Sequence, residues 1–348
     1  MDLQIALILA VDGIANGAVY ALIALGFVLI FAVTRVVFVP FGDIAAFTAL
    51  SLASIEAGRL PGTVGLVTVL AALATLREVV DRIRAGEAAL VPRALLVYLA
   101  LPALPAFAVW LLSGVPLGMP ARILLALLLT LPIAPLIDRI VFRPIADGSV
   151  LLLLTVAVAV HFALVGLGLL FFGPEGFRTQ PLNASIYEFG GVIVSAQTIF
   201  IVAAAIVFSG LLFLVFNATL AGKALRATAI NRVGARLMGI RPARAGTLAY
   251  LLASVLAGIS GVLIAPVNTI FYDSGFLLGL KAFVGAIIGA MASYPATALG
   301  AVLVALLESF ASFYSSALKE VVVFGLLIPV LLWRSLSLGH EEEEEAEE

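Results

Sequence analysis

Long apolar runs follow one another along almost the whole chain, separated by short polar stretches. A helix needs about 20 apolar residues to cross the ~30 Å hydrocarbon core of a bilayer. By this measure the chain is an all-α polytopic membrane protein of about 10–11 transmembrane helices, in one domain over residues 1–339. The predicted spans lie near residues 5–33, 36–56, 62–76, 94–113, 120–137, 149–172, 192–216, 246–265, 276–292, 296–314 and 320–334.

Some of these spans depart from a plain apolar helix. The first is long and contains two glycines beside Asn16, a composition that favours a tilt or a break. The third is short. The ninth and tenth meet across 292–295 with almost no polar loop, so one of them is a candidate re-entrant segment. Gly285 and Gly289 form a GxxxG pattern, which lets two helix backbones approach closely.

The composition supports a membrane protein. Hydrophobic residues make up 63% of the 348 residues and charged residues 11%, whereas soluble domains carry about 25% charged residues. The chain has no cysteine and two histidines, which excludes disulfides, thiolate metal sites and a histidine metal cluster. Residues 340–348 contain seven glutamates, so the formal net charge of −2 for the whole chain becomes −2 + 7 = +5 without them. This acidic tail is predicted to be disordered, and the remainder of the chain is basic.

The basic residues predict the orientation of the chain. Arg35, the 77–93 segment and the 138–147 segment fall on one side of the predicted spans, which is therefore cytoplasmic by the positive-inside rule. The N-terminus is then external and, for an odd number of spans, the C-terminus is cytoplasmic. We interpret 77–93 as a short solvated surface helix ending at Gly86, with Glu78 and Arg82 as an i, i+4 pair. The stretch 173–191 is interpreted as an external loop.

The longest polar interruption in the second half is the stretch 222–242, within a loop predicted at about 218–245. It contains the signals of a short helix, because Asn231 suits the N-cap, Gly239 the left-handed position after the C-terminus, and Pro242 a stop. A two-turn helix is unstable alone in water, so it either docks on another protein or belongs to a solvated loop that only fixes topology. The candidate docking residues are Arg226, Asn231, Arg232, Arg236, Leu237, Met238, Gly239 and Ile240.

A few ionisable side chains fall at membrane depth, where such groups are costly unless they are paired or hydrated. Lys281 and Glu308 are expected to face the bundle interior and to form or approach a salt bridge. The alternative is that Lys281 extends to the outer interface. For His161 a hydrogen-bonded packing role is favoured over contact with a substrate, and Asp43 is a further buried candidate.

No catalytic motif is evident in the sequence. Gly222-Lys223-Ala224 lacks the upstream glycine and the following Ser or Thr of a Walker A motif. No HExxH or GxSxG pattern, and no pair of carboxylates at useful spacing, is present. We therefore expect a protein that is not an enzyme, has no cofactor of its own and cannot hydrolyse ATP by itself.

Three blocks of the sequence resemble the permeases of branched-chain amino acid ABC importers, the LivH type. The first is the segment 17–26, the second is the stretch 226–240 with its Met-Gly-Ile ending, and the third runs from 279 to 314. The resemblance implies an ABC importer permease architecture and an integral permease subunit that forms the translocation pathway in a bacterial inner membrane. It also implies that 231–239 is a coupling helix. The candidate pathway residues are Tyr20, Asp43, Lys281 and Glu308.

The partners implied by the resemblance are a second permease subunit, two cytoplasmic ATP-binding subunits that use the ATP, a periplasmic solute-binding protein and the lipid bilayer. No nucleic acid is expected. The segment 37–42 and the ending 334–339 depart from the family pattern. The solute therefore stays open among branched-chain and other amino acids, urea and short amides. An ion-gradient-driven secondary transporter of amino acids, using Glu308 and His161 at the midplane, is the alternative function.

Overall fold

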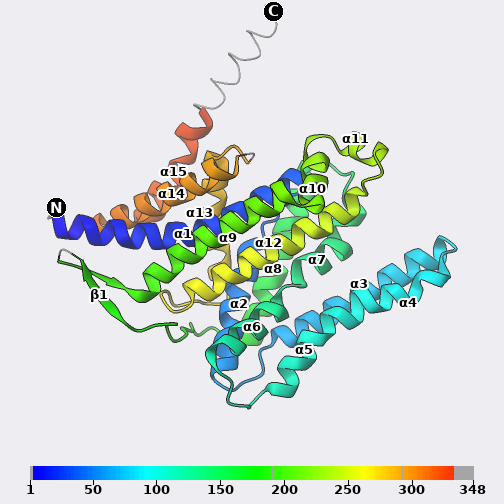
Figure 1. Ribbon diagram of the computed structural model, residues 1–348, viewed down its shortest axis with the longest axis horizontal. Coiled ribbons are helices and arrows are strands. Elements are labelled where there is room, and N and C mark those ends of the chain that lie inside the picture. Colours follow the sequence, from blue (N-terminus) through cyan, green and yellow to red (C-terminus); the bar gives the residue numbers. More distant parts are fainter. Residues whose placement is uncertain (1–2, 190, 292, 333–348) are drawn as a thin grey trace, which may run out of the picture.

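The computed structural model describes residues 3–189, 191–291 and 293–332, so the acidic tail predicted at 340–348 lies outside the described residues. It is a helical bundle with one small antiparallel hairpin formed by β1 (Ile186–Phe189) and β2 (Val192–Ser195) (Figure 1). The helices, in chain order, are α1 (Leu3–Thr34), α2 (Phe41–Glu56), α3 (Thr63–Arg84), η1 (Ala88–Leu90), α4 (Val91–Ala94), η2 (Leu95–Ala100), α5 (Leu101–Leu112), α6 (Met119–Thr130), α7 (Ile133–Ile137), η3 (Asp138–Phe142), η4 (Arg143–Ile145), α8 (Val150–Phe172), α9 (Ala196–Ala218), α10 (Leu220–Ile230), α11 (Arg232–Leu237), α12 (Pro242–Ile264), α13 (Ser274–Ile288), α14 (Tyr294–Tyr314) and α15 (Lys319–Gly325).

Eight helices in the described part of the chain are long and apolar enough to cross a membrane. The segments η1 to α5 form one of them and α6 to η4 another; the other six are α1, α3, α8, α9, α12 and α14. The three remaining predicted spans correspond to α2, α13 and α15, which have 16, 15 and 7 residues. Each predicted apolar run therefore coincides with helical structure, but only eight of the eleven contain a helix long and apolar enough to cross a membrane in the described part of the chain.

One of these shorter helices, α2, begins inside the bundle, where it meets the first turn of α13. The segment 36–40 is not helical and is largely buried, and Pro40 precedes the first residue of α2. The ring of Phe41 lies 5.2 Å from that of Phe27. Phe27 is seven residues before the end of α1, which is about 10 Å along the helix axis. Gly42 packs directly on the first turn of α13 at Gly275. Non-helical backbone at membrane depth is tolerated where protein surrounds it, and the start of α2 meets this condition, whereas Phe271 and Asp273 just before α13 are exposed.

Small residues bring α1, α13 and α14 close together. A Cβ atom added to Gly17 of α1 would lie 2.8 Å from the Cα atom of Val302, and one added to Gly285 of α13 would lie 2.7 Å from the Cα atom of Ala301. Such approaches exclude any side chain larger than hydrogen. The predicted close packing at Gly285 is confirmed. Of the two alternatives for α1, the break is wrong, since α1 is one continuous helix of 32 residues, and the tilt stays a prediction.

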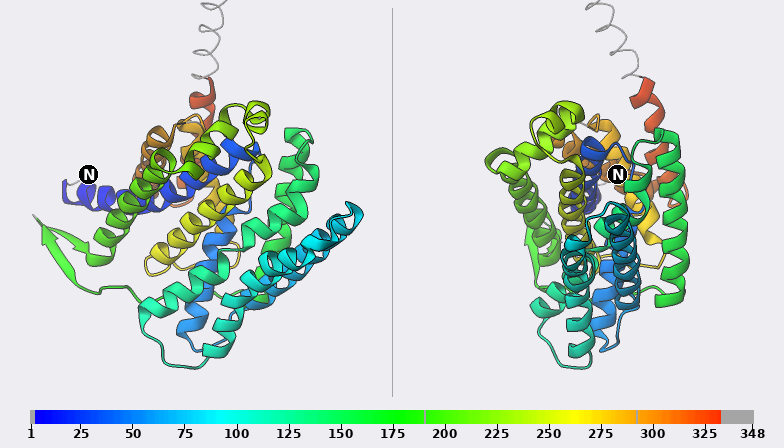
Figure 2. Two further views of the ribbon diagram at one scale, coloured as in Figure 1. Left: turned by 45° about the vertical axis from the view of Figure 1, so that its right-hand side comes forward. Right: turned by 90° about the vertical axis from the view of Figure 1, so that its right-hand side faces the viewer.

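The two ends of the bundle differ. The tip of the α3–α4 hairpin and the short helices α10 and α11 lie toward one end, and the β-hairpin and the loop between α5 and α6 lie toward the other (Figures 1 and 2). The peripheral helices α8 and α9 keep large apolar side chains exposed, such as Phe162 at 67% and Phe213 at 62%. A helix that exposes apolar residues in this way is suited to a lipid environment.

Candidate functional site

An ion pair between α13 and α14 lies at the centre of the candidate site. Nζ of Lys281 is 2.6 Å from Oε1 of Glu308, and the hydroxyl of Tyr20 on α1 donates to the other carboxylate oxygen at 2.9 Å. The side chains of Lys281 and Glu308 are 8% and 14% exposed. The predicted salt bridge is confirmed, and the alternative in which Lys281 extends to the interface is wrong. The close helix packing at Gly17 and Gly285 holds the three side chains together.

A cavity of about 530 Å³ opens beside this ion pair. It lies between the first half of α1, the last half of α14, the start of α13 and the loop before α13, on the side away from α10 and α11. Its polar lining includes Asp12, Asn16, Tyr20, Asn268, Lys281, Glu308, Ser309, Ser312 and Lys319. Its apolar lining includes Leu9, Ile264, Val267, Ile270, Leu277 and Leu278. Charged and apolar surfaces thus face the same space.

Two polar residues of α1 in this lining were not identified from the sequence. Asp12 and Asn16 precede Tyr20 at intervals of four residues, so all three share one face of the helix. This spacing could have identified them from the sequence, because a polar stripe inside an apolar helix indicates a hydrated or paired surface. Asn268 lies in a loop and Lys319 is the first residue of α15, and a polar residue at such a position carries no such signal.

Asp43, the fourth predicted pathway residue, does not line this cavity. Its Oδ2 atom lies 2.7 Å from Nδ1 of His161 on α8, and both side chains are almost completely buried. His161 also stacks on Phe276 with ring centroids 4.7 Å apart. The hydrogen-bonded packing role predicted for His161 is thereby confirmed. The structure brings Tyr20, Lys281 and Glu308 together and leaves Asp43 in a separate polar contact.

The predicted short helix is present as α11 at the opposite end of the bundle. Oδ1 of Asn231 accepts a hydrogen bond from the Gly234 amide at 2.8 Å, which caps the N-terminus. Gly239 follows the helix with φ of 81°, the left-handed conformation that favours glycine. Ala235 packs α11 on the bundle, whereas Leu237 and Met238 are each 83% exposed. The helix is well capped and presents large apolar side chains outward.

The arginines of this region do not all point outward. The guanidinium of Arg226 donates to the carbonyl of Phe216 and to Oδ1 of Asn217, both at 2.7 Å, and so binds the end of α9. Arg232 is half-buried, and Arg236 is exposed. Among the predicted docking residues, Arg232 and Ile240 are half-buried and the other six are exposed. Of these six, Arg226 and Asn231 use their side chains in hydrogen bonds within the bundle, and the outermost group is Arg236, Leu237, Met238 and Gly239.

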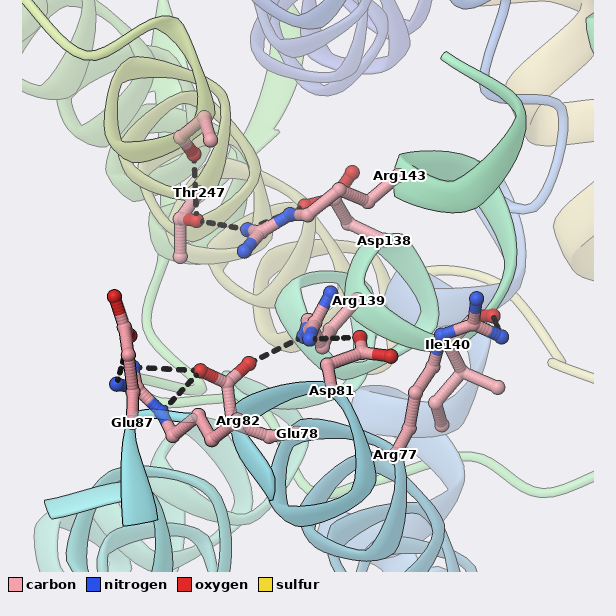
Figure 3. A network of polar contacts seen from close by, with 11 residues as sticks. Arg77, Glu78, Asp81, Arg82, Glu87, Asp138, Arg139, Ile140, Arg143 and Thr247 are labelled. Atoms are coloured by element: carbon pink, nitrogen blue, oxygen red, sulfur yellow. Dashed lines mark hydrogen bonds and ion pairs between the residues drawn. The ribbon is translucent and has the colours of Figure 1, made fainter. Parts of the chain in front are cut away.

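The charged end of α3 forms an ion network with the 138–143 region (Figure 3). Nε of Arg139 lies 2.6 Å from Glu78, and a terminal nitrogen of Arg139 lies 2.7 Å from Asp81. Arg143 bonds both Asp138 at 3.1 Å and the Thr247 hydroxyl at 2.5 Å. The network therefore connects α3 through η3 and η4 to α12, the helix that follows α11.

This network corrects one prediction and confirms another. The 77–93 segment is not a separate solvated surface helix, because α3 continues to Arg84 and its Glu78 is 7% exposed. Partners far along the chain replace water around these charges. The predicted pair of Glu78 and Arg82 is present at 2.7 Å, and Gly86 adopts a positive φ of 73° just after the helix ends, as predicted.

Comparison with known proteins assigns this chain to a family. The family model described as branched-chain amino acid transport system / permease component matches residues 9–331. The chain is 32% identical over 256 residues to the high-affinity branched-chain amino acid transport system permease protein BraD of Pseudomonas aeruginosa, covering 71% of this chain and 83% of BraD. No solved structure matches the chain.

Two further relatives are similar over shorter or more divergent stretches. LivH of Salmonella typhimurium is 28% identical over 204 residues, covering 56% of this chain and 66% of LivH. A probable LivH of Methanocaldococcus jannaschii is 23% identical over 246 residues, covering 68% of this chain and 74% of that protein. The family match spans nearly all the described helices, including α1, α13, α14 and α11. This multi-pass membrane protein belongs to the family of branched-chain amino acid transport system permease components.

Proposed function

We propose that the chain is the permease subunit of an ATP-driven importer and forms part of the pathway for branched-chain amino acids in a bacterial inner membrane. The observation that carries this proposal is α11, a capped helix with Leu237 and Met238 exposed at the arginine-rich end. Large exposed apolar side chains on a rigid short helix are typical of a protein-docking surface. A motor subunit seated there would transmit its movement to α10 and α12, which flank α11 directly.

The proposed partners follow from the family. BraD and LivH are each a permease protein of a transport system, which supports an assembly with a second permease subunit, two cytoplasmic ATP-binding subunits and a periplasmic solute-binding protein. This chain requires no cofactor of its own in the proposal, because ATP is used by the partner subunits. Arg226 and Arg232 support the coupling segment from within, while Arg236, Leu237, Met238 and Gly239 contact the motor subunit, with Asn231 and Ile240 closing the two ends of α11.

The cavity beside Lys281 and Glu308 is the proposed outer part of the pathway. An amino acid is a zwitterion, so its carboxylate requires a cation and its ammonium requires a carboxylate. Lys281 and Glu308 offer both charges 2.6 Å apart, with Tyr20 on the same carboxylate. Leu277 and Leu278 line the same cavity, which suits a branched aliphatic side chain. The solute replaces the internal ion pair with two pairs of its own.

The test of the motor contact uses the complete system expressed from its own gene cluster. Gly239→Val and Arg236→Glu are expected to abolish solute uptake while the protein still inserts in the membrane and retains its folded yield. Gly86→Val is the matched control, since Gly86 also has a positive φ, 73° against 81° for Gly239, and follows the end of α3. Full uptake by both α11 variants would contradict the proposal. So would a purified complex in which no nucleotide-hydrolysing subunit contacts α11. Uptake driven by an ion gradient in ATP-depleted vesicles would favour the secondary-transporter alternative.

A further inference from the structure

A second cavity, also of about 530 Å³, lies at the arginine-rich end and shares no lining residue with the first. It is bounded by the last part of α1, the last part of α9, α10 and the start of α14. The rings of Phe216 and Tyr294 lie 5.2 Å apart and close the wall between α9 and α14. Most of the remaining lining is aliphatic or aromatic, including Leu25, Val33, Leu212, Phe213 and Ala298.

Two arginines, Arg35 and Arg226, contribute the charge of this cavity, and no carboxylate lines it. A terminal nitrogen of Arg35 donates to the Ala229 carbonyl at 3.3 Å, and Arg226 is held by the end of α9. Neither arginine has an ion pair among the described residues. Both guanidinium groups therefore donate to backbone carbonyls of the cavity wall, and no carboxylate among the described residues compensates their positive charge.

The depth of the cavity matches one leaflet. Leu25 and Arg35 are ten residues apart on or next to α1, which corresponds to about 15 Å along the helix axis. Half of a ~30 Å hydrocarbon core is about the same length. The arginines thus lie at the level of the headgroups when the apolar wall lies among the acyl chains. Phe213, 62% exposed, shows that the wall of α9 is open on its outer side.

We propose that this cavity binds an anionic phospholipid of the adjoining leaflet, with an acyl chain along α1 and α9 and its phosphate at Arg35 and Arg226. Guanidinium groups are well suited to phosphate, because their planar donors match its oxygens. A zwitterionic solute does not fit, since the lining offers no carboxylate for an ammonium group. Arg226 belongs to α10, so a lipid bound here contacts the segment that leads directly to α11.

Quenching by brominated lipids tests this proposal in the full-length protein, purified with its associated subunits and reconstituted in vesicles. Phe213→Trp is introduced where Trp110 and Trp333 are replaced by Phe, so that it is the only tryptophan of this chain. The same complex without Phe213→Trp gives the signal of the partner subunits, and the difference reports on the cavity wall. Brominated phosphatidylglycerol is expected to quench at a lower mole fraction than brominated phosphatidylcholine. Each arginine near an anionic headgroup contributes a factor of about 5, or about 25 for the pair.

The variants separate charge from general structure. Arg35→Gln with Arg226→Gln should remove the preference for phosphatidylglycerol, and Arg35→Gln alone should reduce it about five-fold. Replacing both arginines by lysine should retain most of it. Arg244→Gln is the matched control, because Arg244 is exposed near the same end and does not line the cavity. The glutamine variants are compared only where folded yield and helicity match the parent.

Three results would overturn the proposal. Equal quenching by the two lipids would show no recognition of the headgroup. A preference unchanged in the double glutamine variant would show that the arginines do not recognise it. No quenching by either lipid would show that the assembled complex covers the cavity with protein. None of these results bears on whether α11 contacts a motor subunit, so the lipid site and the transport function fail independently.

Discussion

Replacing Lys281 by methionine tests whether the ion pair is both structural and functional. At the 2.6 Å separation of Lys281 and Glu308, Coulomb's law with an effective dielectric constant of about 20 gives an attraction of about 6 kcal/mol. Desolvation of the two buried ions removes most of this, so the intact pair adds little net stability. Loss of one partner is different, because Glu308 then keeps only the Tyr20 hydroxyl. We expect Lys281→Met to lower the free energy of unfolding by about 3–5 kcal/mol.

The double variant Lys281→Met with Glu308→Met separates the two roles. With both charges removed, the free energy of unfolding should return to within about 1 kcal/mol of the parent. Uptake should be abolished in the single and in the double variant, because the cavity then lacks one or both of the charges proposed to bind a zwitterion. Lys319→Met is the matched control, since Lys319 lines the same cavity and has no ion pair among the described residues. It should change stability by less than about 0.5 kcal/mol.

Unfolding in mixed micelles by titration with sodium dodecyl sulfate measures stability, and uptake by cells carrying the complete system measures transport. A single variant that loses under about 1 kcal/mol would refute the reasoning on burial. A double variant that is stable and transports at the parental rate would refute the proposed contact between the pair and the solute, while leaving the structural argument intact.

Three further predictions concern packing, the ion network and the cap. Gly285→Leu should prevent close contact with the α14 backbone and abolish folded yield, while Gly166→Leu, with open space around it, should be tolerated in the same expression assay. Arg139→Ala leaves two α3 carboxylates without this partner and should lower the free energy of unfolding by about 3 kcal/mol. The same change at the exposed Arg84 should lower it by under about 0.5 kcal/mol in the same detergent titration. Asn231→Ala should destabilise α11 by about 1 kcal/mol, detected as faster amide exchange confined to that helix.

Local sequence patterns were sufficient to predict the structural features that depend on neighbouring residues alone. The N-cap at Asn231 and the positive φ at Gly239 depend on a few neighbouring residues, and both were predicted. The pairing of Lys281 and Glu308 is not local, yet its prediction had a physical basis. Charges at membrane depth need partners, and these two residues lie in consecutive predicted spans.

Contacts between distant segments explain what the sequence did not reveal. The helix α2 starts inside the bundle because Gly42 meets Gly275, more than 200 residues away, and hydropathy alone does not detect such a contact. The charged end of α3 is similar. Its pair within the helix, Glu78 and Arg82, was visible as an i, i+4 spacing, while its partner Arg139 lies in another span. A charge run therefore appears solvated until its tertiary partner is known.

Asp43 and His161 show how a buried polar pair can specify helix placement. The buried residues of α8 are Leu153, Ala157, His161, Leu164 and Gly168, one stripe along an otherwise exposed helix. Apolar contacts alone discriminate poorly between registers of such a stripe, because lipid is as apolar as the side chains it replaces. A shift of one turn would leave the Asp43 carboxylate without its imidazole at membrane depth, which is costly. The pair therefore fixes the register of α8 on α2, and His161→Leu should release α8 from the bundle, as measured by faster amide exchange in α8 than in α12.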